Sequence, residues 1–282
     1  MTFKQYLSLC KPRIAVTIAL TAGTGYIAMA KQVDPLALVL LAVAMALGSS
    51  GAAVVNHVWD RDIDGLMKRT STRPMVMGGS RPRALLLAGL LTAAGLILAG
   101  AVFNWVVALH LFLGSFVYVV IYTIWLKRRH WLNIVLGGAA GSFAVLAGAA
   151  AVDPNEFMLP AVLALVLFLW TPSHFWALAI LLTEDYKRAG VPMLPVVVGP
   201  QRTAWWILAN SLALVGSSLL PWTLGLLGPL YAIVAAALGL ALLAFNVKLV
   251  MQPVRFWAGW NFAASMPYLL GLFIAIVLDK HL

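Results

Sequence analysis

Nine long apolar stretches constrain this chain more than any other feature of its sequence. Each is close to the roughly 20 residues that a helix needs to cross a hydrocarbon core about 30 Å thick. They are continuous runs rather than the short alternating segments of a membrane barrel, and lipid offers no partner for unpaired backbone groups, so we predict helices. The sequence therefore predicts an all-α polytopic membrane protein in which residues 1–282 form one domain. The stretches cover residues 14–30, 36–59, 84–103, 106–126, 132–152, 159–182, 203–223, 228–250 and 260–278.

The basic residues indicate how such a chain would sit in its membrane. All but two of the 19 Lys and Arg residues precede the first stretch or fall in the loops of one side; the exceptions are Lys31 and Lys280. By the positive-inside rule, the N-terminus is expected in the cytoplasm. No transit or signal peptide is recognisable before the first stretch, so we expect a multi-pass protein of a bacterial inner membrane. The net charge of +10 is then explained by topology and membrane lipid, and we expect no nucleic-acid partner.

One polar motif stands at the cytoplasmic end of the second apolar stretch. Asn56, Asp60 and Asp64 are spaced four residues apart, so on a helix they form one stripe with neighbouring Cβ atoms roughly 5 to 6 Å apart, while Asp62 points elsewhere. Two carboxylates and an amide oxygen suit a divalent cation. We therefore predict that these three residues are metal ligands in a solvated, cytoplasmic site.

A second acidic group, Glu184-Asp185, closes the sixth stretch on the same predicted face, and basic residues accompany both groups. Mg²⁺ is commonly bound by one or two carboxylates together with substrate phosphates, so acids beside cations indicate a carboxylate–metal–diphosphate arrangement. A diphosphate carried on an allylic isoprenoid would explain the membrane location, because its departure leaves a carbocation that a nucleophile captures. Asp185 is thus a further candidate metal ligand. The candidate diphosphate contacts are Arg13, Arg69, Arg73, Lys127 and Arg128.

The motif Asn56-x₃-Asp60-x₃-Asp64, continued through Arg73-Pro74, resembles the first aspartate-rich motif of the UbiA-type intramembrane prenyltransferase superfamily, in its protohaem IX farnesyltransferase branch. The resemblance implies nine helices around a central cavity. It also implies Mg²⁺-dependent transfer of a farnesyl group from farnesyl diphosphate to a vinyl group of haem B, with water supplying the hydroxyl of haem O. Contact with haem A synthase or the oxidase assembly machinery would follow. Further segments similar to that branch are residues 122–128, 133–141, 171–179 and 185–196.

Within this resemblance, Asn56, Asp60, Asp64 and Asp185 are expected to be catalytic. His174, beside Pro172 in an apolar stretch, is the candidate haem contact, although it could instead bond a neighbouring helix.

The sequence departs from the superfamily pattern around both acidic groups. A second pair of aspartates four apart is common in the superfamily, but Leu181 and Ala189 flank Asp185 at that spacing, so the number of Mg²⁺ ions stays open. His57 stands where many relatives have an aspartate. We expect His57, like His110 and His130, to be solvated near an interface.

Other functions stay open from the residues alone. The acidic groups could simply end helices and balance neighbouring cations. A transporter would place charges near the bilayer midplane rather than at one edge. A non-catalytic haem carrier would need histidines but not the Asn-Asp-Asp stripe. Within the prenyltransferases, the alternative acceptor is an aromatic quinone precursor.

Overall fold

The computed structural model describes residues 1–281, which are mostly helical and contain no β-strand. Eight helical segments are long and apolar enough to cross a membrane. The 18-residue helix α2 adds a ninth long helix in this part of the chain. The elements are α1 (Phe3–Leu9), α2 (Pro12–Met29), α3 (Pro35–Trp59), α4 (Arg61–Leu66), α5 (Arg81–Val102), α6 (Trp105–Phe116), the π-helix η1 (Val117–Leu126), α7 (Asn133–Gly137), α8 (Ala139–Ala150), α9 (Met158–Leu181), α10 (Thr183–Arg188), α11 (Leu194–Ser218), α12 (Leu220–Thr223), α13 (Pro229–Met251) and α14 (Arg255–His281).

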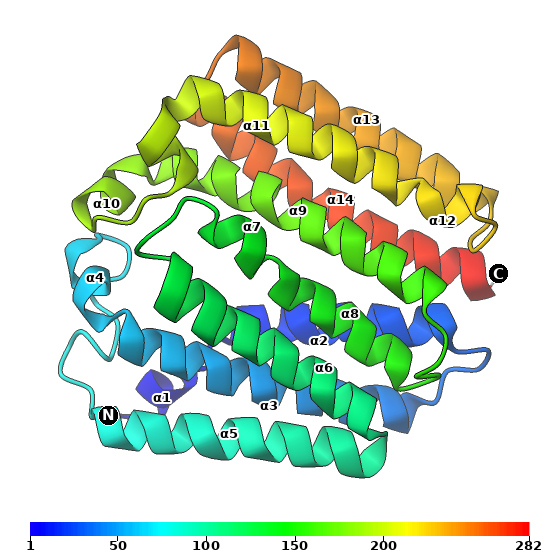
Figure 1. Cartoon of the computed structure of the whole chain (residues 1–282), viewed down its shortest axis with the longest axis horizontal. Coiled ribbons are helices and arrows are strands. Elements are labelled where there is room, and N and C mark those ends of the chain that lie inside the picture. Colours follow the sequence, from blue (N-terminus) through cyan, green and yellow to red (C-terminus); the bar gives the residue numbers. More distant parts are fainter. Residues whose placement is uncertain (282) are drawn as a thin grey trace.

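The long helices lie side by side as one bundle, and the chain begins and ends at opposite ends of it (Figure 1). Helix α3 packs against α2 and α5, α9 packs against α8, α11 and α14, and the last helix α14 returns to contact α2. The short helices α4 and α10 both lie at the end of the bundle where the chain starts (Figure 1). The two acidic segments of the sequence therefore meet at one end, as the loop assignment predicts.

Three of the predicted segments are interrupted in ways the apolar pattern does not show. The fourth passes from α-helix to π-helix at Val117. The fifth is divided at Gly138 into α7 and α8. The seventh passes from α11 to α12 at Leu219, and a break at Gly199, whose φ of 81° is followed by Pro200, separates it from a short helical segment that begins at Leu194. Proline lacks an amide hydrogen and glycine tolerates positive φ, so this pair ends one helix and starts the next.

Close backbone contact fixes α2 against α8. A Cβ added at Gly148 would lie 1.8 Å from the carbonyl oxygen of Ala22, and one added at Gly25 would lie 2.2 Å from that of Val145. Glycine is therefore required at both positions, as is common where membrane helices approach closely. This contact holds α2, and with it the segment that precedes it, against the rest of the bundle.

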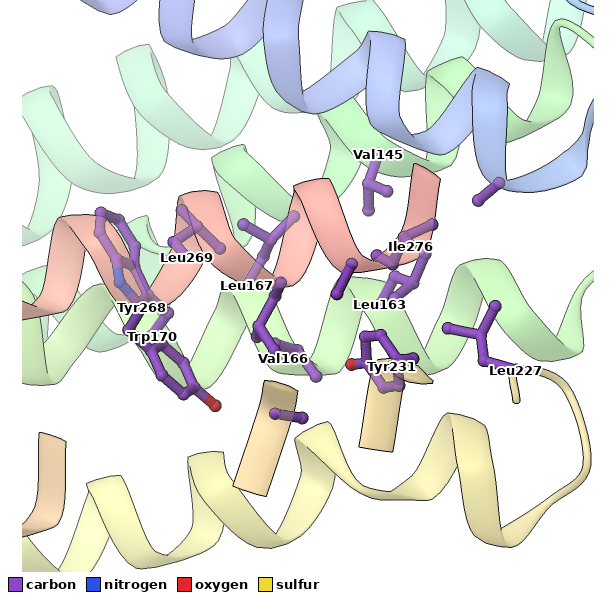
Figure 2. Close-up of a cluster of buried hydrophobic side chains, with 14 of the residues drawn as sticks. Val145, Leu163, Val166, Leu167, Trp170, Leu227, Tyr231, Tyr268, Leu269 and Ile276 are labelled. Carbon is purple, nitrogen blue, oxygen red and sulfur yellow. The ribbon is translucent and has the colours of Figure 1, made fainter. Parts of the chain in front are cut away.

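The C-terminal half has its own apolar core, made largely by α9 and α14 with α11 and α13 (Figure 2). Trp170 from α9 packs there, and its indole Nε1 donates a hydrogen bond to the carbonyl oxygen of Ser265 at 2.8 Å. This bond joins α9 to α14 one turn away from His174, so the core orients that histidine as well.

Candidate functional site

The stripe of Asn56, Asp60 and Asp64 extends across a junction between two helices. Helix α3 ends at Trp59 and α4 begins at Arg61, with Asp60 at the junction in a φ of −85° and a ψ of 4°. The amide of Asp60 still bonds the carbonyl of Asn56 at 2.9 Å, and the amide of Asp64 bonds the carbonyl of Asp60 at 2.8 Å. The helical spacing therefore continues through the junction. The side-chain amide of Asn56 donates to Asp60 Oδ2 at 2.7 Å.

Both stripe carboxylates are buried and paired with cations. Asp60 is 0% exposed and Asp64 is 1% exposed, so the expectation of a solvated site is wrong. Lys127 Nζ forms an ion pair with Asp60 Oδ2, and Arg73 Nη1 lies 2.6 Å from Asp64 Oδ2. A carboxylate withdrawn from water needs such a partner, because burial disfavours its charge. Two predicted diphosphate contacts thus lie directly on the predicted metal ligands.

A cation that the sequence reading missed completes this arrangement. Lys11 Nζ donates to Asn56 Oδ1 at 2.6 Å and to the hydroxyl of Tyr118 at 3.0 Å. Its backbone has a φ of 46°, which turns the chain just before α2. Burial, with repulsion from Arg73 as the next cause, lowers the pKa of Lys11 to about 7. The sequence signal was its position two residues from Arg13, immediately before an apolar stretch.

The π-helix η1 orients side chains of the fourth apolar segment toward this cluster. The amide of Lys127 bonds the carbonyl of Tyr122, five residues earlier, at 2.8 Å. Thr123, from the same wide turn, accepts a hydrogen bond from Asn56 Nδ2 at 3.0 Å. Wide turns of this kind occur frequently at functional sites. Here the turn presents Tyr118, Thr123 and Lys127 to the end of α3.

The other predicted cations lie around the cluster. Arg128 forms two 2.7 Å hydrogen bonds with the exposed Asp62, which raise the pKa of Arg128 and lower that of Asp62. Arg69 donates to the hydroxyl of Tyr186 at 3.3 Å. The side chain of Arg13 is exposed and forms no hydrogen bond or ion pair within residues 1–281.

Asp185 reaches the same end of the bundle from α10. Its Oδ1 accepts a hydrogen bond from the amide of Lys68 at 3.4 Å and lies 3.8 Å from Arg188 Nη1. With the bond between Arg69 and Tyr186, this joins α10 to the loop after α4. The second acidic group is therefore linked to the first through residues 68 and 69.

The polar cluster has two features that fit a metal cation. Asp60 Oδ1 and Asp64 Oδ1 are buried and lack a hydrogen-bond partner among the described residues. The donor set is oxygen-rich, with the amide of Asn56 beside two carboxylates, which suits Mg²⁺ better than a softer metal. In residues 1–281, no group of three or more His, Cys, Asp and Glu side chains is assembled for a metal.

An apolar cavity of about 70 Å³ adjoins the cluster. Tyr118 lines this cavity and also accepts the hydrogen bond from Lys11, so the polar cluster and the cavity share a wall. Ala53 and Ala144 contribute small side chains from α3 and α8. His110, which is half-buried, also lines the cavity, and its Nδ1 is buried and unpaired in the described chain, so it is less solvated than expected. His130 is exposed, as expected.

His174 lies apart from this cluster, among aromatic side chains of α9 and α14. Its ring stacks on Trp170, with 4.3 Å between centroids, and on Phe262, with 4.4 Å. Its Nδ1 is 2.6 Å from Ser265 Oγ, and that hydroxyl donates to the carbonyl of Phe262 at 2.7 Å. The serine proton is thus engaged, so His174 Nδ1 is the donor and Nε2 keeps an available lone pair.

The buried ion pair of Lys127 with Asp60 should dominate the stability of the metal-free cluster. Lys127→Met should lower the free energy of unfolding by about 3–5 kcal/mol, because Asp60 would stay buried without its cation. Arg128→Gln removes a pair with the exposed Asp62 and a longer, 3.9 Å contact with Asp60 Oδ1, and should cost about 1 kcal/mol. Chemical denaturation in detergent with a chelator, followed by tryptophan fluorescence, measures both. Equal losses in the two variants would contradict the assigned burial.

Comparison with known proteins agrees with this geometry. Residues 16–276 match the UbiA prenyltransferase family. The chain is 70% identical over 282 residues to "Protoheme IX farnesyltransferase 1" of Paramagnetospirillum magneticum, with 100% of each chain covered.

Two solved structures share the fold. One, from a study of digeranylgeranylglyceryl phosphate synthase in membranes, has a TM-score of 0.81 at 19% identity and covers 98% of each chain. The other is a UbiA homolog from Archaeoglobus fulgidus bound to DMAPP and Mg²⁺, with a TM-score of 0.69 at 19% identity, covering 96% of this chain and 99% of that one. The match over residues 16–276 and the full-length relative decide the assignment. The chain belongs to the UbiA prenyltransferase family.

Proposed function

We propose that this protein transfers a farnesyl group from farnesyl diphosphate to a vinyl group of haem B, giving haem O, and that residues 1–282 act as one catalytic domain. The observation that carries the proposal is the buried pair of carboxylates, Asp60 and Asp64, faced by three cations at the edge of an apolar cavity. This arrangement suits an ionic head group on an apolar chain. The name of the full-length relative at 70% identity supports the haem acceptor.

Asn56, Asp60, Asp64 and Asp185 would hold Mg²⁺. The Oδ1 atoms of Asp60 and Asp64, which accept no hydrogen bond among the described residues, support this assignment. Bound metal would offset the charge that builds up on the leaving diphosphate. The UbiA homolog from Archaeoglobus fulgidus, with Mg²⁺ and DMAPP bound, supports a metal on this fold.

The cations around the cluster would bind the diphosphate and stabilise it as a leaving group. When the C1–O bond of farnesyl diphosphate breaks, the electron pair departs with the diphosphate. The terminal carbon of the haem vinyl group then forms a bond to the allylic carbocation. Water adds to the resulting cation beside the pyrrole ring and loses a proton, which leaves the hydroxyl of haem O. The proposed diphosphate contacts are Lys11, Arg13, Arg69, Arg73, Lys127 and Arg128.

The two apolar substrates would occupy different parts of the bundle. The cavity beside Tyr118 would receive the farnesyl chain, since it starts at the polar cluster and is lined by apolar side chains. His174 would contact haem B through Nε2, because a histidine that ligates a metal usually donates its other ring N–H to a neighbour, as Nδ1 does to Ser265.

We further place the protein in a bacterial inner membrane with the cluster toward the cytoplasm, on the distribution of its Lys and Arg residues. Many large apolar side chains on the outer faces of the helices are exposed, including Leu86, Ile97 and Leu240, and membrane lipid would cover them. The apolar product would pass to haem A synthase or the oxidase assembly machinery.

A quinone precursor as acceptor is not favoured, because the relative at 70% identity carries the haem-directed name. A transporter would keep charges near the bilayer midplane, whereas these acids gather at the end of α3 and in α4 and α10.

Product mass tests the proposed reaction most directly. Purified protein incubated with haem B, farnesyl diphosphate and Mg²⁺ should yield haem increased by one farnesyl group and one hydroxyl. Excess chelator, or Asp60→Asn, should lower turnover by about 10²-fold or more, because a preorganised electrostatic contact to the leaving group is lost. A prenylated aromatic acid instead of haem O, or full activity in chelator, would overturn the proposal.

The haem contact can be separated from the diphosphate site through His174. His174→Ala should weaken haem binding or shift the Soret band, while binding of a farnesyl diphosphate analogue persists, because the polar cluster does not include this residue. Ser265→Ala is a useful companion, since it removes only the partner of Nδ1 and should have a smaller effect. Wild-type haem affinity and spectrum in His174→Ala would exclude the assigned contact.

A further inference from the structure

His57 is a buried polar side chain that the proposed reaction has not yet used. It follows Asn56 in the last turn of α3 and is 3% exposed. Both ring nitrogens are buried, and neither has a hydrogen-bond partner among residues 1–281. Buried polar groups are nearly always paired in folded proteins. An imidazole with both nitrogens unpaired therefore indicates that a bound ligand supplies the missing partner.

The surroundings of His57 point to the nature of that partner. At 100° per residue, positions 57 and 64 differ by only about 20° around the helix axis, so His57 lies on the side of Asp64. Lys11, Arg73 and Lys127 all lie close enough to act on the ring electrostatically. Each of these cations already has an acceptor in the cluster: Asn56, Asp64 and Asp60 respectively. The cations beside the ring therefore have acceptors, whereas the two ring nitrogens of His57 have no hydrogen-bond partner.

We propose that His57 donates a ring N–H to an oxygen of the substrate diphosphate, an inference that rests on the proposed function. Imidazole carries an N–H in either tautomer, so the contact does not depend on the ring's protonation. Mg²⁺ on Asp60 and Asp64 would release Lys127 and Arg73 from these carboxylates, and an anion is the ligand that the released cations would attract. Direct ligation of Mg²⁺ by the ring is less suitable, because Mg²⁺ prefers oxygen. His57 is thereby a substrate contact at a position where many relatives have an aspartate.

The test is calorimetric titration of inorganic diphosphate, in the presence of Mg²⁺, into wild type, His57→Leu, His57→Phe and His57→Gln. Leu and Phe fill the space without a donor and should weaken binding about tenfold. Gln keeps an N–H and should stay within about threefold of wild type. Binding of haem, followed by the Soret band, should be unchanged in all variants and reports that the bundle is folded. In wild type, Mg²⁺ with diphosphate should also slow deuterium exchange at the imidazole C2 position of His57.

The outcomes separate this inference from the proposed function. If wild type binds diphosphate but the Leu and Phe variants bind it equally well, His57 only fills space and the inference is wrong. An equal loss in the Gln, Leu and Phe variants would also overturn it, because the N–H would not be the cause. If no variant folds, unchanged C2 exchange in wild type decides against the contact. Failure of wild type itself to bind diphosphate with Mg²⁺ would instead contradict the proposed function.

Discussion

The pairing of two buried carboxylates with cations from η1 and from the loop after α4 is the interaction on which the rest of the site depends. Asp60 and Asp64 lie four residues apart and are almost fully enclosed, so their charges would repel one another without Lys127 and Arg73. These pairs fix the end of α3 to the end of η1 and to the loop after α4. Lys11 adds the start of α2 through its bond to Asn56.

The same cations would neutralise acidic groups in both states of the proposed catalytic cycle, without substrate and with it. In the free protein they neutralise the carboxylates, and with substrate bound they would turn to the diphosphate while Mg²⁺ takes their place on the acids. The site would therefore hold nearly equal charge in both states, which limits the cost of keeping it buried. Under the proposed function, the adjoining cavity and the separate surroundings of His174 would give the farnesyl chain and the haem different routes to the reacting atoms.

Apolar length and the four-residue spacing of the motif were sufficient to predict the long helices and the grouping of Asn56, Asp60 and Asp64. The π-helix was not predictable, because its residues are as apolar as those of an α-helix and differ only in which carbonyl each amide bonds. The sequence could not show that Lys11, rather than Arg13, reaches the polar cluster. This depends on the left-handed backbone of Lys11, which no sequence pattern predicts. Burial of the carboxylates was missed because it comes from tertiary neighbours.

The exchange of cations between carboxylates and diphosphate is tested most directly by titrating Mg²⁺ and inorganic diphosphate into the protein separately and together. Mg²⁺ alone must displace a cation from a carboxylate, and diphosphate alone must draw a cation away from its carboxylate, so either ligand by itself leaves a charge unpaired. When both bind, Mg²⁺ pairs with the carboxylates and the diphosphate pairs with the cations. We expect each ligand to raise the affinity of the other by at least about tenfold, and by the same factor, as linkage requires. Affinities that are the same alone and together would contradict the account.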